Sequence, residues 1–83
     1  MRMGGAVFVV VSYGIGDDRA RNRVAEVLKD YGKRVQYSVF ECQLEPDLVA
    51  EMRMDLEKIP RGKRDEIRLY FLCARCAERT VQA

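Results

Sequence analysis

The 83-residue sequence contains no histidine and no tryptophan. Without an imidazole, no side chain has an ordinary pKa near neutral pH, so hydrolytic chemistry would need a metal ion held by carboxylates. A long apolar run is also absent. The longest, residues 6–11, is too short for a signal-peptide core and far too short to span a bilayer. These absences predict a cytoplasmic protein with no membrane partner.

Cysteine is scarce and odd in number, with Cys42, Cys73 and Cys76. In a chain without a secretion signal, this predicts reduced thiols rather than disulfides. Cys73 and Cys76 have the spacing of zinc ligands, but a structural zinc needs four ligands and only Cys42 remains. The favoured role is packing, and a four-cysteine site pooled by two chains is the alternative.

The sequence has no large excess of charge of one sign, since 15 basic and 13 acidic residues leave a net charge of +2. That balance does not indicate nucleic-acid binding by itself, so the distribution of charge must decide. The length predicts a single domain over residues 1–83. A domain of this size has a thin core and commonly gains stability from a second copy, which favours a homodimer.

The first half of the sequence has the pattern of a strand followed by a helix. The apolar run predicts a central strand over residues 5–13, buried on both faces. Gly14 begins the turn after it, and Asp17 or Asp18 can cap a helix that ends at Gly32. The apolar positions of that helix recur at helical spacing: Val24, Val27, Leu28 and Tyr31.

Residues 33–44 are rich in Val, Tyr and Phe and predict either one long strand or a tight hairpin turning near Tyr37 and Ser38. Pro46 suits the first turn of a second helix, which ends at residues 60–63. Its apolar stripe is Leu48, Val49, Met52, Leu56 and Ile59. The side chains of residues 66–73 alternate in the pattern of a strand with one more solvent-exposed face. Residues 80–82 suggest a short edge strand.

This order of elements predicts an α+β fold of the ferredoxin-like, split βαβ type (βαββαβ), with both helices on one face of a mostly antiparallel sheet. The other face has no helix to cover it. A second subunit is the simplest cover.

Two stretches of the sequence resemble a known family. They are VVSYGI at residues 10–15 and RVAEVLKDYGKRVQYSVFECQL at residues 23–44, of which residues 32–42 are the most specific. Together with the YFLCARC run at residues 70–76, they resemble the CRISPR-associated protein 2 family, the small dimeric subunit of the machinery that inserts spacers into a CRISPR array.

The resemblance implies a homodimer with facing sheets and selects the hairpin for residues 33–44. It also implies two partners, the integrase subunit of spacer acquisition and duplex DNA. Several members are described as metal-dependent nucleases acting on RNA or DNA. In those, an aspartate directly after the tyrosine of the first strand, one from each subunit, binds Mg²⁺ near the two-fold axis.

The sequence departs from this pattern where the metal would bind. Tyr13 is present, but Gly14 follows it and leaves the metal-ligand position vacant. Asp17 and Asp18 are the remaining candidates for the metal, although capping a helix is the favoured role for both. The predicted function is therefore a dimeric adaptor of spacer acquisition. A Mg²⁺-dependent endonuclease, impaired at Gly14, and a stand-alone RNA-binding module are the alternatives.

Basic side chains cluster around both predicted helices and could position phosphates. The candidates for binding nucleic acid are Arg19, Arg21, Arg23, Lys33, Arg34, Arg61, Lys63 and Arg64. Tyr37, Val39 and Phe40 could form a platform for stacked bases, but core or dimer-interface packing is favoured, and the resemblance places them in the dimer interface. Glu41 could pair with Arg34.

Overall fold

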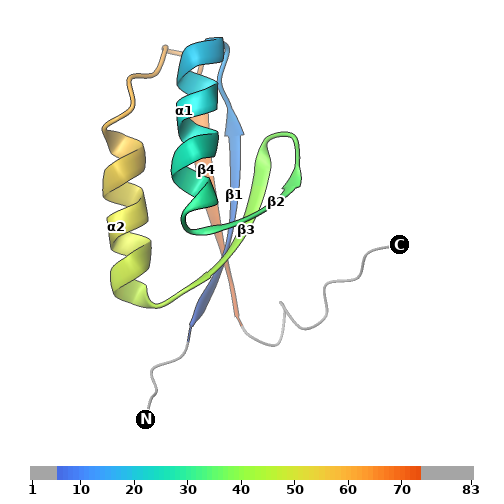
Figure 1. The fold of residues 1–83 in the computed structure, drawn as a ribbon, viewed down its shortest axis with the longest axis vertical. Helices are drawn as coiled ribbons and strands as arrows, with labels where there is room; N and C mark the ends of the chain where they lie inside the picture. Colours follow the sequence, from blue (N-terminus) through green and yellow to red (C-terminus); the bar gives the residue numbers. More distant parts are fainter. Residues whose placement is uncertain (1–5, 74–83) are drawn as a thin grey trace.

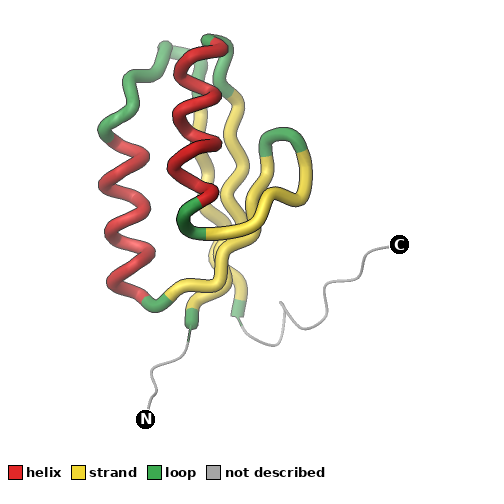
Figure 2. The backbone as a smooth tube through the Cα atoms, in the orientation of Figure 1, coloured by secondary structure: helices red, strands yellow, loops and turns green. Residues whose placement is uncertain are grey.

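The computed structural model describes residues 6–73 (Figure 1). The elements are β1 (Val7–Gly14), α1 (Asp18–Lys29), β2 (Gly32–Gln36), β3 (Val39–Leu44), α2 (Pro46–Glu57) and β4 (Glu66–Leu72). The strands form one sheet in the order β2-β3-β1-β4, and every neighbouring pair is antiparallel. Both helices lie on the same side of this sheet (Figures 1 and 2). The predicted ferredoxin-like α+β fold is confirmed.

β1 is central, as predicted, but only one of its faces is buried in the single chain. Val9, Val11 and Tyr13 point toward the helices and are at most 3% exposed. Phe8 and Val10 lie on the opposite face of the sheet, here called the open face, and are half-buried. The expectation of burial on both faces is therefore wrong for one chain, because no element of residues 6–73 covers the open face. The strand also runs to Gly14 rather than ending at residue 13.

The core lies between the sheet and the helices. Val24 and Leu28 of α1, Met52 of α2 and Phe40 of β3 are all 0% exposed there. Leu48, predicted on the apolar stripe of α2, is 39% exposed instead. Successive helical residues are about 100° apart, and the burial of Val49 turns Leu48 toward solvent.

The predicted end of the first helix is wrong. α1 is capped at its C-terminus by Asp30, and Gly32 is the first residue of β2. A Cβ on Gly32 would lie 2.4 Å from the carbonyl oxygen of Glu41 and 2.5 Å from Sγ of Cys42. Glycine is therefore required at this position by the close approach of β3, not by the end of a helix.

The hairpin is confirmed, with its turn at Tyr37 and Ser38 between β2 and β3 (Figure 2). Pro46 occupies the first turn of α2, as predicted.

β4 has exposed side chains on both faces near its end, since Tyr70 is 47% and Phe71 is 55% exposed. Only one wet face was predicted there, and the second arises because β4 is an edge strand.

Cys76 and the edge strand expected at residues 80–82 lie outside the described residues. Neither helix in residues 6–73 is long and apolar enough to cross a membrane.

Candidate functional site

Gly14, where the family resemblance implies a metal ligand, is the last residue of β1 and lies directly opposite Glu66 of β4. It is exposed, and a Cβ built on it meets no other atom within 4 Å. A side chain would therefore fit at this position without moving its surroundings. Glycine is not needed here for packing.

A shallow hollow of about 330 Å³ lies around Gly14. It is lined by Ser12, Tyr13, Gly14, Arg64, Glu66, Arg68 and Tyr70. Ser12 is the direct partner of Arg68 across the sheet, as Gly14 is of Glu66. Directly paired residues of neighbouring strands have their side chains on the same face, so the hollow occupies the Gly14 end of the open face.

Tyr13 has its side chain on the other face of the sheet, where it is 3% exposed. Its ring lies next to that of Phe40, with ring centroids 6.3 Å apart. Its hydroxyl donates a hydrogen bond to the carbonyl oxygen of Tyr37 at 3.4 Å. These contacts join the end of β1 to the hairpin turn, so the tyrosine contributes to packing.

The charged groups of the hollow are partly paired with one another. Nε of Arg68 donates a hydrogen bond of 2.6 Å to Oε1 of Glu66, and another guanidinium nitrogen donates to the hydroxyl of Tyr70 at 3.4 Å. The hydrogen bonds to Tyr70 and Glu66 raise the pKa of Arg68 above its ordinary value, so the arginine stays charged. Arg64 is exposed and makes no side-chain hydrogen bond or ion pair with the described residues.

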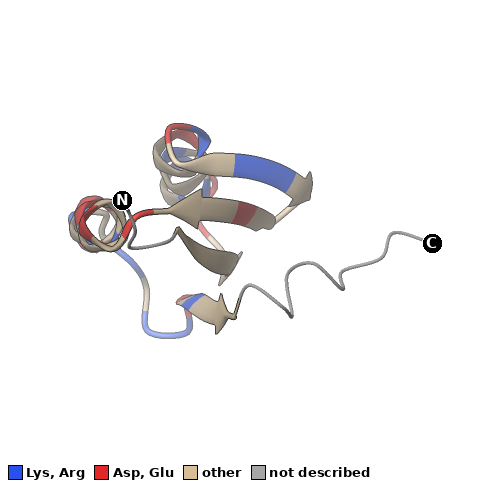
Figure 3. Cartoon of the chain, turned by 90° about the horizontal axis from the view of Figure 1, so that it is seen from below, with Lys and Arg blue, Asp and Glu red and all other residues tan. Residues whose placement is uncertain are grey.

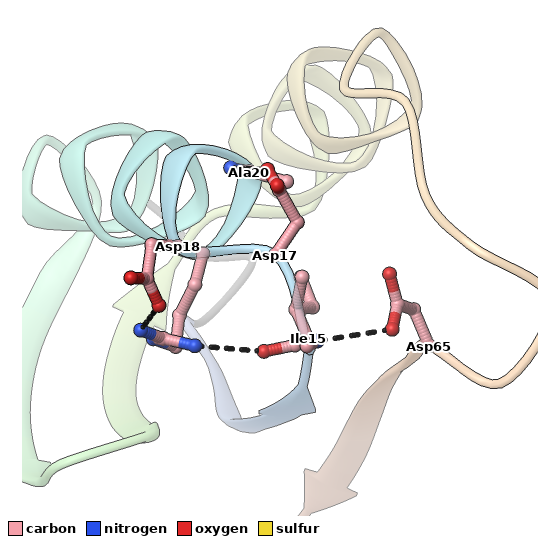
Figure 4. Close-up of polar contacts among 7 residues, drawn as sticks. Ile15, Asp17, Asp18, Ala20 and Asp65 are labelled. Carbon is pink, nitrogen blue, oxygen red and sulfur yellow. Dashed lines mark hydrogen bonds and ion pairs between the residues drawn. The ribbon is translucent and has the colours of Figure 1, made fainter.

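Three aspartates near Gly14 are each held by contacts of their own (Figure 4). Asp17 is the N-cap of α1, where its Oδ2 accepts a 2.8 Å hydrogen bond from the backbone nitrogen of Ala20. Asp18 is ion-paired with Arg21. Asp65 accepts hydrogen bonds from the backbone nitrogens of Gly62 at 2.7 Å and Gly16 at 3.1 Å, which lower the pKa of its carboxyl.

These positions do not fit the magnesium site that the family resemblance implies. Mg²⁺ prefers oxygen ligands in near-octahedral geometry, and Gly14 provides none. Asp17 and Asp18 turn toward α1, and the Glu66 carboxylate is paired with Arg68 (Figure 4). No three carboxylates or thiolates gather at one metal-binding position within residues 6–73. The capping role predicted for Asp17 is confirmed.

Two of the predicted phosphate-binding arginines make contacts within the chain. Arg21 donates to the carbonyl oxygen of Ile15 at 3.0 Å, pairs with Asp18 and lies 5.8 Å from the centre of the Tyr37 ring, so its side chain is only 22% exposed. The guanidinium of Arg34 lies 5.4 Å from the centre of the Phe40 ring. The Arg21 side chain therefore stabilises the connection between β1 and α1 and is mostly withdrawn from solvent.

The other candidates are exposed: Arg19, Arg23, Lys33, Arg61, Lys63 and Arg64. They lie on α1, on β2 and in the loop between α2 and β4 (Figure 3). The loop group is adjacent to the hollow, since Arg64 lines it. Of these basic groups, the loop group is therefore the one placed beside the Gly14 end of the sheet.

The proposed base-stacking platform does not form. Phe40 is 0% exposed on the helix side of β3, whereas the preceding residue, Val39, is on the open face, because successive strand residues alternate. Phe40 belongs to the core, and its place in the predicted dimer interface is wrong. Tyr37 is 68% exposed and Val39 half-buried, and both stay predicted interface residues.

The suggested pairing of Glu41 with Arg34 is not present. Glu41 is aligned with Lys33 across β2 and β3, while Arg34 is aligned with Phe40. Glu41 and Arg34 therefore lie on opposite faces of the sheet.

Four residues of the hollow were not among the sequence candidates: Ser12, Glu66, Arg68 and Tyr70. The alternation predicted for residues 66–73 would put Arg68 and Tyr70 on one face of the strand. Only the register of β4 against β1 brings them to Gly14, and periodicity does not contain that register.

Known proteins of one family match this chain along most of its length. A family model described as "CRISPR associated protein Cas2" matches residues 7–80. The chain is 46% identical over 63 residues to "CRISPR-associated endoribonuclease Cas2 3" of Synechocystis sp., covering 76% of this chain and 68% of that protein. It is 47% identical over 75 residues to the protein of the same name in Chloroflexus aurantiacus, covering 90% and 81%.

Solved structures agree with this match. Cas2 of Streptococcus pyogenes superposes with a TM-score of 0.79 at 32% identity, over 92% of this chain and 98% of that chain. A hypothetical protein from Thermus thermophilus gives a TM-score of 0.78 at 37% identity, over 84% and 85%. With the fold and the family sequence pattern both present, the chain belongs to the CRISPR-associated protein Cas2 family.

Proposed function

We propose that this chain forms a homodimer and serves as the adaptor of CRISPR spacer acquisition, binding duplex DNA by its backbone and docking the integrase subunit. The observation that carries the proposal is Gly14. The position lacks the carboxylate that a nuclease of this family would need, while the fold around it is intact. An adaptor needs only the fold, the dimer surface and the basic surface.

The basic surface supports duplex binding. Arg61, Lys63 and Arg64 are exposed on one loop, and Arg19 and Arg23 are exposed on α1. Such side chains attract phosphates without reading base edges. Binding by this surface is expected to survive a change of DNA sequence and to weaken steeply as salt rises.

The open face supports a dimer. Phe8 and Val10 of β1 and Val39 of β3 are only half-buried on it, and Tyr70 of β4 is 47% exposed beside them. An apolar sheet face without a covering layer is typical of an interface. A second copy supplies an identical face across a two-fold axis.

A Mg²⁺-dependent endonuclease is the second candidate, because the relatives from Synechocystis sp. and Chloroflexus aurantiacus are named endoribonucleases. The two functions separate when labelled RNA and duplex DNA are incubated with the purified chain, with and without Mg²⁺. If the chain is an adaptor, it is expected to bind without metal-dependent cleavage, and Gly14→Asp is expected to gain cleavage. Cleavage by the parent chain that Gly14→Asp fails to increase would count against the adaptor proposal.

Docking of the integrase subunit needs its own test. Co-expression of a tagged chain with the integrase subunit of the same CRISPR locus is expected to give a stable complex on size-exclusion chromatography. Failure of the two to co-elute, at a salt concentration where each is soluble, would contradict the adaptor proposal.

A further inference from the structure

The loop between α2 and β4 is closed into a turn by Asp65. The backbone nitrogen of Asp65 donates a hydrogen bond of 3.2 Å to the carbonyl oxygen of Gly62, and its Oδ2 accepts one of 2.7 Å from the Gly62 nitrogen. Lys63 and Arg64 are the two corner residues of this turn. The turn therefore presents basic side chains on a backbone that is closed by two hydrogen bonds.

The second carboxylate oxygen of Asp65 joins this turn to the connection between β1 and α1. Oδ1 accepts a hydrogen bond of 3.1 Å from the backbone nitrogen of Gly16 (Figure 4). The neighbours of Gly16 have contacts of their own, since the carbonyl oxygen of Ile15 accepts a 3.0 Å hydrogen bond from Arg21, and Asp17 is the N-cap of α1. Asp65 therefore fastens the loop to a connection that is itself held in place.

This link brings together two groups of exposed basic residues that are far apart in the sequence. They are Arg19 and Arg23 on α1 and Arg61 and Lys63 in the loop. A groove of about 150 Å³ between the groups is lined in part by both arginines of α1 and by residues 59–60 at the start of the loop. None of the four side chains forms an ion pair with another described residue, so their charges are available to a bound duplex.

We infer that Asp65 is a positioning residue for the duplex-binding surface, holding the loop against the β1–α1 connection so that the two basic groups act as one surface. The inference deepens the proposed function and rests on it for the duplex. A surface that is ordered before binding avoids the free-energy cost of ordering its loops and side chains in the complex. Asp65 is acidic and contacts no phosphate, so it acts only through the turn.

The sign of one substitution separates positioning from simple charge. Asp65→Asn removes a negative charge beside a basic loop, so electrostatics alone would strengthen duplex binding. Positioning predicts the opposite, because the amide provides one oxygen acceptor in place of two and one link is lost. The Kd of the purified chain for a short DNA duplex is expected to rise about fivefold. An unchanged or lower Kd would overturn the inference.

Two further variants control for charge and for the remaining acceptor. Asp47→Asn removes an equal charge in the first turn of α2, away from the loop, and is expected not to raise the Kd. Asp65→Ala removes both oxygens and is expected to raise the Kd more than Asp65→Asn does. Circular dichroism checks that each variant is folded under the binding conditions. Equal weakening by Asp47→Asn and Asp65→Asn would mean a general effect of the substitution and would overturn the inference.

A double-mutant comparison tests whether Asp65 acts through the loop. In a chain that carries Arg61→Gln and Lys63→Gln, Asp65→Asn is expected to lose most of its effect on the Kd. The same fold-change in both backgrounds would place the effect elsewhere and would overturn the inference. Duplex binding by the parent chain that Asp65→Asn does not weaken removes the inference and leaves the adaptor proposal standing. A parent chain that binds no duplex removes both.

Discussion

Gly14 on β1 is the direct cross-strand partner of Glu66 on β4, and the carboxylate of Glu66 lies 2.6 Å from Nε of Arg68. The acidic side chain directly opposite Gly14 is thus already paired with an arginine. An acidic residue at position 14 would face this pair and be exposed to Arg64. The net charge at this end of the sheet therefore depends on position 14, where a side chain would fit without a steric clash.

Gly14→Asp is expected to change the free energy of unfolding by no more than about 0.5 kcal/mol, as is usual for an exposed substitution that meets no neighbouring atoms. Chemical denaturation of the parent and the variant measures the difference. The control is Gly32→Ala, whose Cβ would clash with the Glu41 carbonyl at 2.4 Å and which is expected to cost about 2 kcal/mol. A larger loss in Gly14→Asp than in Gly32→Ala would contradict this account of the two glycines.

Asp17→Ala is expected to lower the free energy of unfolding by about 1 kcal/mol, because it removes the oxygen that accepts the Ala20 N–H at the start of α1. Thermal or chemical unfolding measures it, and Asp17→Asn is expected to recover most of the loss. Asp18→Ala is the control, since an exposed ion pair with Arg21 contributes only about 0.5 kcal/mol. A larger loss of unfolding free energy in Asp18→Ala than in Asp17→Ala would contradict the assignment of Asp17 as the N-cap of α1.

Much of the fold follows from local patterns in the sequence. The spacing of Val24 and Leu28 predicted the buried side of α1, and Pro46 predicted the start of α2. These features depend on residues close together in the chain, where propensity and periodicity act directly. The position of Gly32 was misassigned because glycine serves both helix ends and close strand approaches, and only β3 decides between them.

The candidate site was predicted only at its centre. Gly14 was identified from the sequence as a vacant ligand position, but Arg68 and Glu66 become its neighbours through the register of β4, some 50 residues further along the chain. Arg21 was expected at the surface, whereas its contacts with Ile15 and Asp18 take it out of solvent. Charge counts do not distinguish an arginine that binds a carbonyl oxygen from one that is free.

Tyr31→Phe is expected to cost about 1 kcal/mol, because the Tyr31 hydroxyl donates a 2.6 Å hydrogen bond to Oδ2 of Asp55 and so joins the end of α1 to α2. The bond to Asp55 raises the pKa of Tyr31 above the ordinary value of 10.0. A raised pKa in the folded chain means that the stabilisation is complete below about pH 10 and is lost as the pH rises further.

The free energy of unfolding, measured for parent and Tyr31→Phe from about pH 8 to 11, checks this sign. The difference between the two proteins is expected to shrink at the alkaline end. Tyr37→Phe is the control, because its side chain is 68% exposed, and its effect on the free energy of unfolding is expected to be small. A Tyr31→Phe difference that grows with pH would contradict the assignment.

Protonation of Asp65 is expected to loosen both connections that meet at the Gly14 end of the sheet. The carboxylate bridges the backbone nitrogens of Gly62 and Gly16, so it joins the loop before β4 to the loop after β1. These hydrogen bonds lower the pKa of Asp65, and a lowered pKa in the folded chain means stability that is present above about pH 3.9 and lost as the pH falls further. The amide proton signals of Gly16 and Gly62 are therefore expected to titrate together, with one midpoint below about pH 3.9.

Asp65→Asn keeps the shape of the side chain but provides one oxygen acceptor in place of two, so one of these two amide protons is expected to lose its partner at every pH. Asp47→Asn is the matched control, since within residues 6–73 Asp47 accepts a hydrogen bond only from the adjacent Leu48 at the start of α2. Separate midpoints for the two amides in the parent chain would show that Asp65 does not bridge them. Because Arg64 and Glu66 flank Asp65 in the chain, a broken bridge is expected to displace both side chains as well as to break the link between the loops.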